Sequence, residues 1–150
     1  MRTVRISLIM VFSVWAVAFV WAQAQKVTTA EEYDKTMKAV GAANGALRKA
    51  VASSAFDDAK KQVPVLRQNI LNAETFWVEK KKTDAQGWIK DAKTKLDAVE
   101  KALNASPVDA PAVMATLKEL GGTCTACHME YREQDPAGGY RIKPGKIDGM

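Results

Sequence analysis

The chain has 150 residues, with 22 Lys and Arg against 17 Asp and Glu, so its formal net charge is +5. This length is enough for one domain with its own hydrophobic core. The basic residues are scattered, with only residues 80–82 forming a short run. Nucleic-acid binding needs a basic stripe or face, so the composition argues against that class.

The N-terminus predicts an exported protein. Arg2 and Arg5 precede an uncharged apolar run at 6–22, and Ala-Gln-Ala follows at 22–24. These are the three parts of a secretory signal peptide, so residues 1–24 are predicted to be removed and the remaining chain to reside in the periplasm. The apolar run is close to the roughly 18 residues of a membrane span, so an uncleaved membrane anchor is the alternative.

The rest of the chain predicts an all-α domain at residues 25–132. Apolar residues recur at steps of three and four without strand-like alternation, which indicates helices over about 29–52, 54–81, 83–104 and 108–132. Short links between four amphipathic helices favour an antiparallel four-helix bundle.

Local signals refine these helices. Thr29 and Glu32 fit a capping box at the start of the first helix. Pro64 is expected to kink the second helix or delay its start, and Thr83 or Asp84 is expected to cap the third. Residues 133–150 are rich in Pro and Gly, so an irregular C-terminal tail is predicted.

The chemistry is concentrated in the fourth helix, at Cys124-Thr-Ala-Cys127-His128. C-x-x-C-H is the signature of covalent c-type haem attachment. Positions i, i+3 and i+4 share one helix face, so two thiols there can bond the two vinyl groups of one haem. The adjacent His128 then reaches the iron. One covalent haem c is therefore predicted, near the C-terminal helix.

Other interpretations of the motif are weaker. Two cysteines in an exported protein often form a disulfide, and that alternative stays open beside a chance triplet. His128 is the only histidine, so a zinc site built on these residues lacks a fourth ligand of the usual type. A thioredoxin-like C-x-x-C needs a βαβ context, which the helical pattern does not provide.

The second axial ligand of the iron would decide the function. After the predicted cleavage the remaining methionines are Met37, Met114, Met129 and Met150. Met129 adjoins His128 and cannot reach the opposite haem face. Met37 lies on the apolar face of the first helix, where spacing alone allows either iron ligation or plain core packing.

At this point the motifs resemble a known family, the cytochromes c-prime and c-556. Residues 124–132 resemble the family's C-x-x-C-H-x-x-[FY]-R ending, and residues 33–41 resemble the first-helix motif of the c-556 branch. The resemblance implies that Met37 stands at the distal haem face. It also implies that low-spin members carry electrons, whereas high-spin members lack the distal ligand and bind carbon monoxide or nitric oxide.

The resemblance also leaves a question about the haem propionates. Many members carry arginine four residues before the distal position, where this chain has Tyr33, so Lys35 or Lys38 is a candidate substitute. Arg132 lies one turn after His128, beside either the haem edge or a propionate, or else as a solvated helix-end arginine. Trp88 is expected near the haem or in the core, and Tyr131 is expected to line the core.

The residues together favour a periplasmic electron-transfer cytochrome with His128 and Met37 as iron ligands and redox proteins as partners. The alternative is a high-spin protein that binds nitric oxide or carbon monoxide. A haem-free helical bundle with a disulfide is the third interpretation. No acid–base pair accompanies the motif, so an enzyme is not expected. Dimers are common in the family, so a homodimer is among the properties that the resemblance implies.

Overall fold

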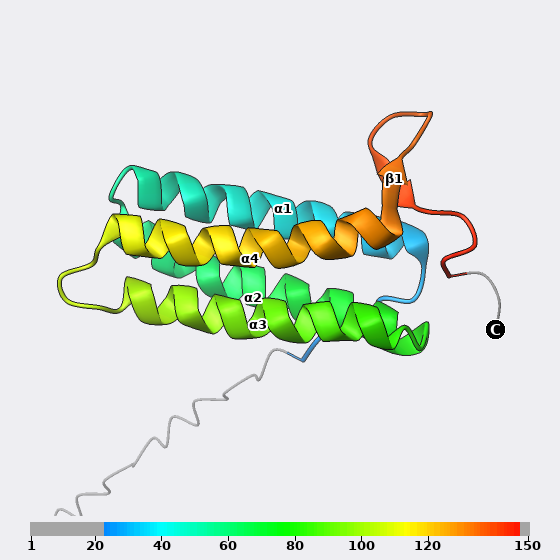
Figure 1. Cartoon of the computed structure of the whole chain (residues 1–150), viewed down its shortest axis with the longest axis horizontal. Helices are drawn as coiled ribbons and strands as arrows, with labels where there is room; N and C mark the ends of the chain where they lie inside the picture. The colour runs from blue at the N-terminus through cyan, green and yellow to red at the C-terminus, as the bar shows by residue number, and fades with distance from the viewer. Residues whose placement is uncertain (1–22, 148–150) are drawn as a thin grey trace, which may run out of the picture.

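The computed structural model describes residues 23–147 and consists mainly of four helices. They are α1 (Ala30–Ala52), α2 (Phe56–Glu79), α3 (Thr83–Leu103) and α4 (Ala110–Tyr131). Figure 1 shows the four helices side by side, each running opposite to the one before it. The predicted helical bundle is confirmed. Most of the predicted signal peptide at 1–24, and Met150, lie outside the described residues. Within 23–147 no helix is long and apolar enough to span a membrane.

The structure tests three of the predicted helix signals. The Thr29 hydroxyl accepts a 3.1 Å hydrogen bond from Glu32 N, and the Glu32 carboxylate accepts one from Thr29 N, which completes the capping box. The expected side-chain cap of α3 is wrong: Lys82 is the N-cap and its side chain makes no capping hydrogen bond. α2 begins at Phe56 and continues through Pro64, so the proline does not delay its start.

The bundle has an aliphatic half and an aromatic half. The fully buried side chains of the aliphatic half come from the end of α1, the end of α3 and the start of α4: Leu47, Val51, Leu103, Val113 and Leu117. Burying each such side chain contributes about 1.5–3 kcal/mol. Because neighbouring helices are antiparallel, the start of α1 meets the end of α2 in the other half, where Tyr33, Phe76 and Trp77 are buried.

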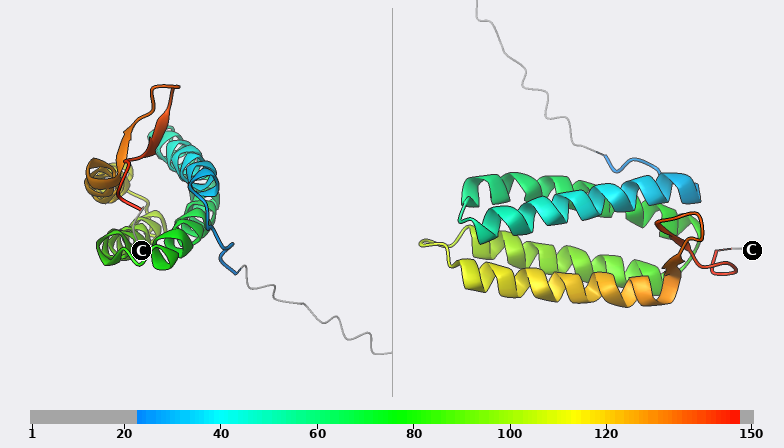
Figure 2. Two further views of the ribbon diagram at one scale, coloured as in Figure 1. Left: turned by 90° about the vertical axis from the view of Figure 1, so that its right-hand side faces the viewer. Right: turned by 90° about the horizontal axis from the view of Figure 1, so that it is seen from above.

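The seam between α1 and α4 differs from the other three seams of the bundle. It is the most loosely packed of the four, whereas α1 packs closely on α2 and α3 packs closely on α4. Figure 2 shows the bundle end-on, with α1 and α4 separated beneath the C-terminal segment. Space along a bundle seam is where cofactor sites are usually built.

Part of the C-terminal tail, which is predicted to be irregular, forms a short hairpin. β1 (Arg132–Gln134) pairs antiparallel with β2 (Tyr140–Ile142), and Gly138 and Gly139 close the turn with φ values of 104° and 80°. Only glycine adopts such positive φ values without strain, so these two residues permit the turn. Ile142 packs against the core, and Lys143 N donates to Tyr131 O at 2.8 Å, which anchors the hairpin to α4.

Candidate functional site

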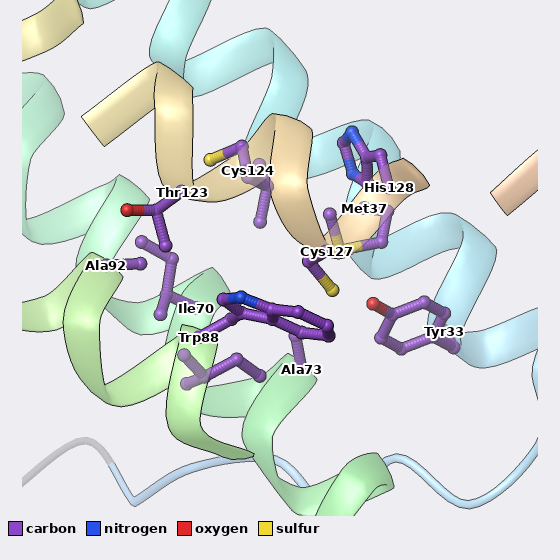
Figure 3. Close-up of a pocket in the computed structure, with 12 residues that line it drawn as sticks. Tyr33, Met37, Ile70, Ala73, Trp88, Ala92, Thr123, Cys124, Cys127 and His128 are labelled. Atoms are coloured by element: carbon purple, nitrogen blue, oxygen red, sulfur yellow. The ribbon is translucent and has the colours of Figure 1, made fainter. Parts of the chain in front are cut away.

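The residues predicted to carry the chemistry meet in one cleft. Cys124, Cys127 and His128 from α4 and Met37 from α1 all line an opening of about 510 Å³. The same four side chains also line a smaller inner cavity of about 50 Å³. Figure 3 shows side chains from all four helices converging around this inner cavity. The loose α1–α4 seam thus opens onto the C-x-x-C-H motif.

Both cysteines are free thiols that are partly buried. Burial raises the pKa of Cys127 to about 11, with the neighbouring Cys124 and Asp84 adding to the shift. Burial also raises the pKa of Cys124, although the positive charges of Arg48 and Lys95 oppose the change. The two thiols are therefore protonated at neutral pH and react slowly as nucleophiles on their own.

His128 is poised as a neutral imidazole. Burial lowers its pKa, and repulsion by Arg132 lowers it further. The neutral form is the one that binds metals. Within residues 23–147 no three His, Cys, Asp or Glu side chains cluster as a ready-made metal cage, so the zinc interpretation gains no support from the side chains around His128.

Met37 is the methionine that the fold brings to the site. Its side chain is partly buried and faces the cleft from α1, opposite the helix that carries His128. Met114 packs against the core and does not line the cleft, and Met129 is 73% exposed. Among the described methionines, Met37 is the one that lines the cleft together with His128.

An aromatic cluster packs beside the cleft and contributes Tyr33, Trp77 and Tyr131 to its lining. Tyr33 stacks on Phe76 at 4.6 Å and meets the edge of Trp77 at 5.2 Å, and Trp77 lies 4.5 Å from Tyr131. Trp77 Nε1 donates a 2.9 Å hydrogen bond to Tyr33 Oη. This contact joins residues that lie far apart in the chain.

Tyr131 and Trp88 occupy the positions expected of them. Tyr131 is buried, as predicted, and its hydroxyl donates to both carboxylate oxygens of Asp84 at 2.8 Å. Although burial raises the pKa of Asp84, hydrogen bonds from Tyr131 and from Ala85 N outweigh it, so the pKa lies below its usual range. Trp88 lines the inner cavity and packs on the core. Asp84 therefore lies inside the first turn of α3, not at its N-cap, and its carboxylate accepts from both Tyr131 and Ala85 N.

The hairpin and α1 form the outer rim of the cleft. Arg132, predicted at the end of the fourth helix, is instead the first residue of β1, and its guanidinium lies 4.0 Å from the Tyr140 ring. Lys38 lines the rim but pairs with Asp34 at 2.6 Å. Lys35 pairs with Glu31 at 2.8 Å and does not line the cleft, so it is poorly placed to reach a group inside.

The cleft is large, and most of its lining residues are apolar or aromatic. Asn44 Oδ1 is buried without a hydrogen-bond partner and its residue lines the cleft. Gly41 lies one turn after Met37, and a side chain built there meets only open space. A ligand in the cleft therefore has room against α1. Two thiols, a neutral imidazole and a thioether are the donor set that a covalently bound haem uses.

Comparison with known proteins identifies no relatives for this chain. No protein-family model matches it, no curated protein matches it, and no solved structure matches it. The assignment of function therefore depends on the residues of the cleft and on the chemistry of the C-x-x-C-H motif.

Proposed function

We propose that this protein is a monohaem c-type cytochrome that carries electrons in the periplasm. The proposal rests on one observation: the C-x-x-C-H side chains of α4 and the Met37 side chain of α1 line the same cleft. Haem c would be held covalently at Cys124 and Cys127, with His128 and Met37 as iron ligands. Bound haem supplies a one-electron iron couple, and His/Met ligation raises its potential.

The attachment chemistry needs no oxidant. Each thiol would add across one vinyl double bond, forming a sulfur–carbon bond while the thiol proton ends on the other vinyl carbon. Because burial keeps both thiols protonated, we expect attachment to depend on cellular machinery that activates them. His128 keeps its neutral form beside them, so its ring nitrogen is free to bind iron.

The surrounding residues would tune the site by excluding water. The inner cavity is walled by apolar side chains and indole, among them Ile70, Ala73 and Trp88. A dry, apolar shell favours the iron state of lower charge and so raises the potential. These residues would shield a bound cofactor from water.

The runner-up is a high-spin protein that binds nitric oxide or carbon monoxide. One observation favours it: the apolar inner cavity of about 50 Å³ leaves some free volume beside Met37. If the Met37 thioether packs in the core instead of ligating, that volume becomes a site for a small diatomic ligand. Met37 is thus the residue that separates the two functions.

An optical experiment separates these functions. The full chain is produced in a periplasm with haem-attachment machinery, and spectra are recorded oxidised, reduced, and reduced under carbon monoxide. Electron transfer predicts a sharp low-spin reduced spectrum that ignores the gas, with haem that stays on the chain after denaturation and organic extraction. A broad spectrum that shifts with carbon monoxide supports gas binding instead, and a colourless protein contradicts both.

A further inference from the structure

The loose seam between α1 and α4 is joined by one polar contact. Within residues 23–147 a single hydrogen bond links the two helices: the half-buried Arg48 guanidinium on α1 donates to the main-chain carbonyl of Leu117 on α4. By comparison, two separate sets of ion pairs join α2 to α3, one of which links Glu74 to Lys93 at 2.6 Å. The polar connection between α1 and α4 therefore depends on Arg48.

Gly121 leaves the space into which the Arg48 guanidinium reaches. A side chain built at Gly121 would have its Cβ 3.1 Å from Arg48 Nη2, whereas one built at the neighbouring Gly122 meets nothing within 4 Å. Each glycine in a helix interior costs about 1 kcal/mol relative to alanine. The approach of Arg48 gives a physical reason for glycine at position 121, but not at position 122.

The contact between Arg48 and Leu117 lies where the cleft ends. Along the chain, Asn44 is the last residue of α1 that lines the cleft, and Cys124 is the first residue of α4 that does so. Arg48 follows Asn44 by about one helical turn, and Gly121 precedes Cys124 by about one turn. The contact therefore forms the floor of the cleft.

This floor is equally far along the two helices from Met37 and from His128. Arg48 follows Met37 by eleven residues, and Leu117 precedes His128 by eleven residues. Eleven residues make about three turns, so the members of each pair lie on one side of their helix and about 16 Å apart along its axis. Because α1 and α4 are antiparallel (Figure 1), spreading the two helices at the floor would move Met37 away from His128.

We propose that Arg48 and Gly121 form a clasp that fixes the spacing of α1 and α4 at the floor of the cleft, and that Arg48 is thereby a positioning residue for the bond between Met37 and the iron. This inference rests on the proposed function and adds the residue that keeps the distal ligand within reach. Both cysteines and His128 belong to α4, so the Met37 bond is the one iron bond that would cross the seam. A wider seam would break that bond first and open the iron to carbon monoxide.

The hydrogen bond of Arg48 has to be separated from its charge. Arg48 forms no salt bridge within residues 23–147, and its charge lies close enough to Cys124 to oppose the rise in the pKa of that thiol. A cation near the haem favours the ferrous state, so it would raise the reduction potential without moving Met37. One variant must therefore displace the guanidinium and keep its charge.

Four variants of the full chain, each with haem attached, make this separation. Arg48→Met removes the hydrogen bond and the charge, whereas Gly121→Leu fills the space of the guanidinium and keeps the charge. Both should enlarge the high-spin ferrous fraction that binds carbon monoxide, and both should speed amide hydrogen exchange in 40–52 and 113–124. Arg48→Lys keeps a donor and the charge, so it should lie closer to the unmodified protein. Gly122→Leu adds the same side chain at an exposed position and should match the unmodified protein.

A milder pair covers the case in which a larger variant fails to fold. Gly121→Ala requires the guanidinium to move by a few tenths of an ångström, whereas Gly122→Ala meets open space. Both substitutions raise the helix propensity of α4 equally. Gly121→Ala should therefore show the larger carbon monoxide-binding fraction and the faster exchange of the two, and equal behaviour of the pair overturns the clasp.

The remaining outcomes are equally decisive. If Arg48→Met and Gly121→Leu both match the unmodified protein, the clasp is wrong and the cytochrome stands. If Arg48→Met shifts the potential while Gly121→Leu changes neither carbon monoxide binding nor exchange, the effect belongs to the charge and the clasp is again wrong. An unmodified protein that is already high-spin contradicts ligation by Met37. Hydrogen exchange then decides the clasp alone: faster exchange in both variants upholds it, and unchanged exchange overturns it.

Discussion

Trp77 Nε1 donates a 2.9 Å hydrogen bond to Tyr33 Oη inside the aromatic half of the bundle, joining α2 to α1. Both side chains are buried, and Tyr33 stands one turn before Met37 on the cleft side of α1. Burial raises the pKa of Tyr33 above its ordinary value, and the nearby Cys127 adds to the shift, so the hydroxyl stays protonated. This contact fixes the wall from which Met37 projects.

Tyr33→Phe should therefore destabilise the fold. The substitution keeps the stacked ring but leaves the buried Trp77 N–H without an acceptor, which costs about 1–3 kcal/mol. Chemical denaturation followed by tryptophan fluorescence measures the loss. Tyr140→Phe, which removes a hydroxyl from an exposed ring, serves as the control and should change stability little. Equal stability of Tyr33→Phe and the unmodified protein would show that water or another acceptor replaces the contact.

Met37→Ala should convert a low-spin iron into a high-spin one. Loss of the thioether removes the proposed second axial ligand, so the reduction potential falls and the ferrous protein gains reactivity with carbon monoxide. Optical spectra and a redox titration record both changes. Met114→Ala is the matched control, because it truncates a methionine packed outside the cleft and should leave the spectrum unaltered. An unchanged spectrum in Met37→Ala would rule out ligation by Met37.

Replacing the two cysteines separates attachment from ligation. Cys124→Ala combined with Cys127→Ala should abolish covalent attachment, so haem becomes extractable after denaturation. His128→Ala should leave both thiols able to bond the vinyl groups while removing the imidazole from the iron. The first variant is assayed by organic extraction and the second by its spectrum. Haem that resists extraction from the double-cysteine variant would place the covalent bond elsewhere.

Tyr131→Phe should reduce stability in a pH-dependent way. The hydroxyl donates to Asp84 and holds the pKa of that carboxyl below its usual range. A lowered pKa stabilises the fold fully above the unfolded-state value of about 3.9, and this contribution is lost as pH falls through the folded-state value. The substitution should cost about 0.5–1.5 kcal/mol at neutral pH, because Asp84 is exposed to solvent, and the difference should shrink in acid. Denaturation midpoints at several pH values test this, and a constant difference would contradict it.

Local patterns in the sequence predicted most of the secondary structure. Apolar spacing predicted four helices close to their observed bounds, and the Thr29–Glu32 capping box was predicted because both partners lie within one turn. The C-x-x-C-H spacing likewise needed no tertiary information, since Cys124, Cys127 and His128 share one helix face by helical geometry alone. These features depend on residues that are neighbours in the chain.

Only the tertiary structure decided the rest, because it depends on contacts between distant residues. Asp84 resembled a cap by sequence, yet its partner Tyr131 reaches it from another helix. The Pro- and Gly-rich tail indicated irregular structure, but anchoring of Ile142 on the core lets two glycines close a hairpin over the cleft. The sequence by itself thus determined which groups α4 presents, whereas packing of the helices determined that Met37 faces them and that Arg132 lies at the mouth of the cleft.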